Sequence, residues 1–222
     1  MPALTLAFWR MFAASGILWG YSITRKKTSL SKENLFLTGF AGLFLGLHFT
    51  CFFWGVRNTS IANATLLANT GPFFTALFAF AKTGRLKTSV FLGLGFSFLG
   101  LIIVQTSKSD LVQNNTLGNL VSLLSGLFLA ITYNYAKKIR KESSAVIYGR
   151  TLFLIASLTI FFIWFAFDRS PLLFNTNHFF GILFLGLVPS ILGHNSLNYS
   201  IKYLSPTAIA SIPLGEPIIA SL

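Results

Sequence analysis

The fold is decided by residues 59–105, which read TSIANATLLANTGPFFTALFAFAKTGRLKTSVFLGLGFSFLGLIIVQ. Two apolar runs of about twenty residues flank a short basic turn at residues 82–87. No charged residue lies at positions 60–81 or 88–106. Each run is therefore long enough to cross the roughly 30 Å hydrocarbon core of a membrane as a helix.

A weaker copy of the first run ends the chain, where residues 204–222 read LSPTAIASIPLGEPIIASL. A shift of 145 positions aligns Ser60 with Ser205, Pro72 with Pro217, and Arg57 with Lys202. This similarity predicts two related halves, residues 1–107 and 115–222, of which the second is cut short.

The composition excludes an ordinary soluble domain. The chain is 54% hydrophobic and 10% charged, and its mean hydropathy is +0.70, so it lacks the polar surface that a soluble protein of this size needs. Its net charge of +12 does not indicate nucleic-acid binding, because the basic residues cluster in short connections between apolar runs. A single cysteine, Cys51, rules out an internal disulfide.

Eight apolar segments have nearly the length of a spanning helix: residues 3–23, 35–56, 60–81, 89–106, 117–136, 146–167, 179–201 and 205–222. The predicted fold class is therefore all-α, a polytopic membrane helical bundle. The odd-numbered connections and their borders hold twelve Lys and Arg residues, whereas the even-numbered ones hold three. Because cytoplasmic loops are rich in Lys and Arg, we expect the odd-numbered loops in the cytoplasm and both ends of this chain outside.

Small residues at four-residue spacing predict close helix contacts. The fifth segment has Gly118, Ser122, Gly126 and Ala130, and shorter pairs are Gly42 with Gly46 and Gly16 with Gly20. We expect these positions to pack within the chain, although a homodimer interface is left open.

The sequence around the two prolines resembles the drug/metabolite transporter superfamily, and within it the EamA-like exporters. Their first half has a helix with small residues and a central proline, then a basic turn and a Gly-rich helix. The matching positions here are Ala62, Ala64, Ala68, Pro72, Gly84, Arg85, Leu86, Gly93, Gly95 and Gly100, and in the second half Gly215, Glu216 and Pro217. One departure is that Gly84 is followed by Arg85, where the family has Gly-Glu.

The resemblance implies an inverted repeat of the ten-helix type, of which this chain has about eight helices and lacks the first and the last. It further implies a secondary transporter in the cell (inner) membrane that exports amino acids or related metabolites by alternating access. Three alternatives remain: a carrier of S-adenosylmethionine or nucleotide sugars, an intramembrane enzyme, and a truncated, inactive membrane protein.

Arg10 and Glu216 are charged residues inside apolar segments. A charge there costs at least about 2.5 kcal/mol, so Arg10 is expected either to contact an anionic substrate or to reach back to the membrane surface. Glu216 is expected either to couple proton movement or to bond a carbonyl freed by Pro213 or Pro217. Together with Pro72, these prolines are predicted to kink the gating helices.

Other polar residues of the apolar segments are candidates for the substrate cavity, although residues of this kind more often serve packing: Asn69, Tyr133, Asn134 and His194. The sequence has no phosphate-binding loop and no metal-ligand motif. We therefore predict a transporter and no enzyme, with no cofactor and no metal. The expected partners are a small-molecule substrate and the lipid bilayer, and not nucleic acid.

Overall fold

The computed structural model describes residues 2–24, 29–85, 88–106, 115–167 and 176–215, nearly all of which are helical. In chain order the elements are α1 (Ala3–Ile23), α2 (Lys32–Asn58), α3 (Ile61–Ala68), α4 (Gly71–Thr83), α5 (Thr88–Thr106), α6 (Thr116–Ile139), α7 (Ala145–Phe167), α8 (Thr176–Leu185), the π-helical η1 (Gly186–His194), α9 (Asn195–Ser200), α10 (Pro206–Ser211) and the 3₁₀ turn η2 (Ile212–Gly215).

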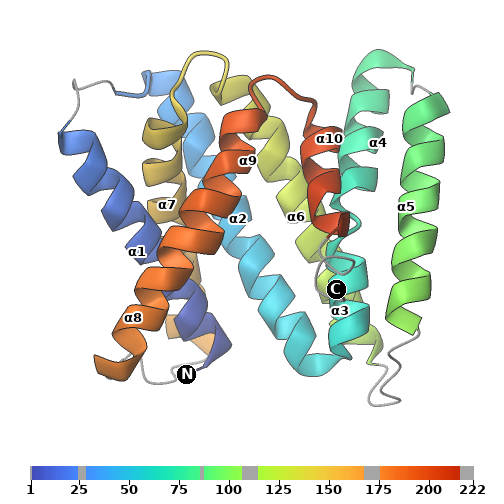
Figure 1. Ribbon diagram of the computed structural model, residues 1–222, viewed down its shortest axis with the longest axis horizontal. Coiled ribbons are helices and arrows are strands. Elements are labelled where there is room, and N and C mark those ends of the chain that lie inside the picture. Colours follow the sequence, from blue (N-terminus) through green and yellow to red (C-terminus); the bar gives the residue numbers. More distant parts are fainter. Residues whose placement is uncertain (1, 25–28, 86–87, 107–114, 168–175, 216–222) are drawn as a thin grey trace.

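The helices lie side by side in one bundle (Figure 1). α2 is central and packs along α6 and α7, while α1 packs on α7. α3 and α4 pack on α6, and α5 lies at one end of the bundle beside α4. Among the described residues, six helical stretches are long and apolar enough to span a membrane. The prediction of an all-α, polytopic membrane bundle is confirmed.

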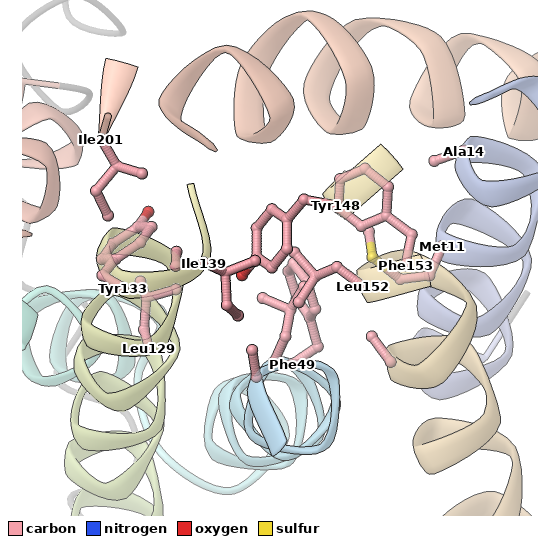
Figure 2. Packing of buried hydrophobic residues seen from close by; sticks show 14 of the residues in the cluster. Met11, Ala14, Phe49, Leu129, Tyr133, Ile139, Tyr148, Leu152, Phe153 and Ile201 are labelled. Atoms are coloured by element: carbon pink, nitrogen blue, oxygen red, sulfur yellow. The ribbon is translucent and has the colours of Figure 1, made fainter. Parts of the chain in front are cut away.

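A buried hydrophobic cluster joins α1, α2, α6 and α7. Tyr148, Leu152 and Phe153 of α7 are at most 1% exposed. Figure 2 shows these side chains between Met11 of α1 on one side and Tyr133 of α6 on the other. This packing holds the four helices in fixed positions, and with them the polar side chains that they carry.

Small residues bring helices close together at two of the predicted places. A Cβ added at Gly42 or Gly46 of α2 would lie 2.6 Å from a side chain of α7. At Gly126 of α6, it would lie 2.8 Å from the last carbonyl oxygen of α3. A Cβ at Gly16 or Gly20 would meet no described atom within 4 Å, so the prediction of close contact within the chain is wrong for this pair.

The third predicted span is two helices, α3 and α4, instead of one kinked helix. Pro72 lies in the first turn of α4 and has no N–H to donate to the carbonyl of Ala68, four residues back. The Thr70 hydroxyl donates to the Leu67 carbonyl oxygen at 2.6 Å. The freed carbonyl of Ala68 lies against Gly126, where the absence of a side chain leaves room for it.

The seventh predicted span contains a π-helical segment, η1, that the sequence analysis did not predict. Pro189 within it cannot donate to the carbonyl of Leu185. The hydroxyl of Ser190 donates to this carbonyl oxygen at 3.0 Å instead. The carbonyl oxygen of Leu185, to which Pro189 cannot donate, is therefore still hydrogen-bonded. Such π turns inside helices are frequent at functional sites.

α3 and α10 begin with equivalent caps. Ser60 Oγ accepts a hydrogen bond from the N–H of Asn63 at 3.1 Å, and Ser205 Oγ accepts one from the N–H of Ala208 at 3.2 Å. Both residues of the second cap follow those of the first by 145 positions. In Figure 1, α3 starts at the lower edge of the bundle and α10 at the upper edge, so the two run in opposite directions.

The helix ends that border the odd-numbered loops lie at one edge of the bundle, the upper edge in Figure 1. This edge, called the basic edge below, comprises the C-terminal ends of α1, α4, α6 and α9 and the N-terminal ends of α2, α5, α7 and α10. The loops that are rich in Lys and Arg therefore share one side. That this side faces the cytoplasm stays a prediction from the distribution of charge.

Candidate functional site

Arg10 of α1 contacts two other elements of the bundle. Its Nε–H donates to Ser190 Oγ of η1 at 2.9 Å. Its Cζ lies 4.9 Å from the centre of the Phe49 ring of α2, within the range of a cation–π interaction. The Ser190 hydroxyl also donates to the carbonyl oxygen of Leu185. The π-helical turn therefore positions the hydroxyl that accepts the hydrogen bond from Arg10. The guanidinium is therefore held between α1, α2 and η1.

Two histidines lie beside this cation. The ring of His194, at the end of η1, is 5.5 Å from that of Phe49 in an edge-on arrangement. His48 of α2 is buried, and its Nδ1 lies 2.9 Å from Ser125 Oγ of α6. His48 precedes Phe49 in α2, and His194 follows Ser190 by one turn in η1, so both imidazoles come from the elements that hold Arg10. The Arg10 site comprises Arg10, His48, Phe49, Ser125, Ser190 and His194.

The Arg10 site has the chemistry to bind an organic anion. A guanidinium presents a planar fork of donors that fits a carboxylate with two parallel hydrogen bonds. The imidazoles of His48 and His194 can donate or accept further hydrogen bonds. The face of Phe49 supplies an apolar surface for the carbon skeleton of a ligand. Since a charge within the hydrocarbon is costly, charged residues there commonly mark a substrate or ion pathway.

Three other predicted cavity residues occupy different places in the bundle. Tyr133 is part of the buried cluster and is 2% exposed. Asn134 donates from Nδ2 to the carbonyl oxygen of Ala130 in its own helix at 2.9 Å and lines a pocket at the basic edge. Asn69 follows α3 at the helix break, and its Nδ2 is buried without a hydrogen-bond partner among the described residues.

The prolines predicted at the gating helices have different positions. Pro72 is the second residue of α4, and Pro213 lies in η2 directly after α10. Glu216 and Pro217 lie outside the described residues, so their predicted roles stay predictions.

Phe49, Ser125 and Ser190 were not identified from the sequence. Ser190 follows Pro189 within an apolar span, and this pair is a local signal of an interrupted helix. Phe49 is one of 25 phenylalanines, and neither it nor Ser125 stands out locally. Within the described part of the chain, no group of three His, Cys, Asp or Glu residues could hold a metal ion.

Two stretches of the chain, residues 1–106 and 116–222, match the model of the EamA-like transporter family. The chain belongs to the EamA-like transporter family. The resemblance to the drug/metabolite transporter superfamily is thereby confirmed. This EamA-like protein is a multi-pass membrane transporter.

Relatives agree with this assignment. An uncharacterized transporter of Archaeoglobus fulgidus is 25% identical over 218 residues, which are 95% of this chain and 74% of that transporter. The pseudopaline exporter CntI of Pseudomonas aeruginosa is 28% identical over 132 residues, which are 59% of this chain and 45% of the exporter. A solved crystal structure that covers the whole chain has a TM-score of 0.79 at 14% identity, and the match spans 78% of that structure. At this identity it supports the fold alone.

Proposed function

We propose that this EamA-like protein exports a small organic metabolite with a carboxylate, an amino acid or a related compound, across the cell membrane. The observation that carries the proposal is the Arg10 site, where a guanidinium, two imidazoles and a phenyl ring from three elements lie together within the bundle. The carboxylate would lie on the guanidinium of Arg10. Export is supported by the relative named as a pseudopaline exporter.

Alternating access would use the two interrupted helices. The α3–α4 pair and α10 begin with equivalent serine caps, run in opposite directions, and meet where α10 packs on α4. Interrupted helices from two oppositely oriented repeats are the elements that rock or gate in many secondary transporters. The division into repeats at residues 1–107 and 115–222 belongs to this proposal.

A transport assay on the purified chain tests the substrate class. The chain is reconstituted into liposomes loaded with one solute, and exchange of the labelled solute is measured for amino acids and for matching amines that lack the carboxylate. We expect exchange of at least one amino acid and none of its amine. Exchange of a nucleotide sugar without any amino acid would overturn the assignment, whereas exchange of S-adenosylmethionine alone, which has an amino-acid carboxylate, would narrow it to that compound. Everted membrane vesicles, in which export appears as uptake, test the direction.

The variant Pro72→Ala tests the gating role of the helix break. Alanine supplies an N–H that can bond the carbonyl of Ala68 and favour a continuous α3–α4 helix. One such bond is worth about 1 kcal/mol, so exchange should slow by about fivefold while the melting temperature stays the same or rises. The control is Pro206→Ala, at the first position of α10. Unchanged exchange in Pro72→Ala would remove the gating role.

A further inference from the structure

A second site lies between α4 and α6 at the basic edge, separate from the Arg10 site. It is a pocket of about 610 Å³ lined by four lysines and by four mainly apolar side chains: Lys82, Lys137, Lys138 and Lys141, with Phe78, Ile131, Asn134 and Tyr135. Tyr135 stacks with Phe40 of α2, which is itself exposed, with ring centroids 6.1 Å apart. The pocket therefore adjoins a part of the bundle surface with exposed aromatic residues.

The four lysines differ in their partners. Lys138 Nζ lies 2.8 Å from Glu33 Oε1, and Lys137 Nζ donates to the carbonyl oxygens of Lys202 and Leu204. Lys82 and Lys141 are exposed, and neither forms an ion pair within the described ranges of the chain. The positive charges of Lys82 and Lys141 in the pocket are therefore not neutralised by any acidic residue in the described part of the chain.

The lining changes from apolar to basic toward the membrane surface. On α6, Ile131 precedes Lys138 by seven residues, and on α4, Phe78 precedes Lys82 by four. At 1.5 Å per residue, the apolar part lies roughly 6–10 Å deeper than the ammonium-bearing positions. A phospholipid has the same order, with its phosphate at the surface and its acyl chains below.

We propose that this pocket binds an anionic phospholipid of the cytoplasmic leaflet. The headgroup phosphate lies between Lys82 and Lys141, and an acyl chain lies along Phe78 and Ile131. Basic pockets between membrane helices on the cytoplasmic side suit such headgroups. An inorganic phosphate would match the lysines alone and would leave the apolar part of the pocket uncovered, so the lipid is the better fit.

Native mass spectrometry of the full chain in detergent tests the proposal. The chain is titrated with phosphatidylglycerol and, separately, with phosphatidylcholine of the same acyl chains. We expect tighter binding of phosphatidylglycerol. The double variant Lys82→Gln/Lys141→Gln should weaken it by about 25-fold, because each lysine near the surface is worth about fivefold. The matched control Lys32→Gln/Lys202→Gln removes the same charge at the same edge and should leave binding unchanged.

An arginine variant and a competition with inorganic phosphate distinguish the proposal from its alternatives. The variant Lys82→Arg/Lys141→Arg keeps both charges and should keep phosphatidylglycerol binding, which separates loss of charge from loss of folding. Equal loss of binding in the control pair and the pocket pair would overturn the proposal, as would equal affinity for both lipids. Displacement of bound phosphatidylglycerol by millimolar inorganic phosphate would show a site for soluble anions and would also overturn it.

Discussion

Replacing Arg10 with glutamine is expected to lower amino-acid exchange by about 10- to 100-fold, because a hydrogen bond to a charged group is worth about 1.5–3 kcal/mol. Glutamine can still donate to Ser190 but has neither the charge nor the fork that fits a carboxylate. Initial exchange rates at several substrate concentrations are the measurement. If the carboxylate lies on Arg10, the apparent affinity should fall together with the rate.

Arg150 provides a matched control for this prediction. It also lies in a membrane span, donates to a serine hydroxyl (Ser22), and lies 4.1 Å from an aromatic ring (Trp19). Arg150→Gln therefore removes a similar set of contacts outside the Arg10 site. We expect it to keep most of the exchange activity. A loss of similar size in both variants, with folding intact, would mean that the Arg10 site has no special role in transport.

The spans were predicted well because they depend on segment length and on the absence of charge. The breaks inside them were not, since a proline within an apolar run fits both a kink and a full interruption. At Pro72 a residue distant in the sequence permits the full interruption, because Gly126 of α6 leaves space for the carbonyl of Ala68 that the proline frees. At Pro189 the freed carbonyl is bonded by the neighbouring Ser190 instead.

The site was predictable only in part. Arg10 was singled out because a charge in hydrocarbon needs an explanation, and Arg150, inside the predicted span at residues 146–167, meets the same criterion. Its partner Ser190 is 180 residues away in the chain, and no local pattern connects the two. His48 and Ser125 are likewise brought together by the packing of α2 on α6. Asn69, Tyr133 and Asn134 were also candidates from the sequence, but the contacts found for Asn134 and the burial of Tyr133 and Asn69 do not link them to Arg10.

Gly126→Leu is expected to destabilise the protein by about 1–3 kcal/mol, a typical cost of overpacking a close contact, and to abolish exchange. A Cβ at this position would lie 2.7 Å from Thr70 Oγ1 and 2.8 Å from the carbonyl oxygen of Ala68. The side chain would therefore push α6 away from the break between α3 and α4. Thermal unfolding in detergent, followed by size-exclusion chromatography, measures the first effect, and liposome exchange measures the second.

Gly20→Leu is the control, because Gly20 is also helical and a Cβ there meets no described atom within 4 Å. It should leave the melting temperature nearly unchanged. Gly126→Ala gives an intermediate test, since it adds the Cβ alone and should lower the melting temperature less than leucine does. If Gly126→Leu were as stable as Gly20→Leu, α6 would not pack against the break. The freed carbonyl of Ala68 would then not lie against Gly126. Contact with α6 could then not be what fixes the position of the α3–α4 pair during gating.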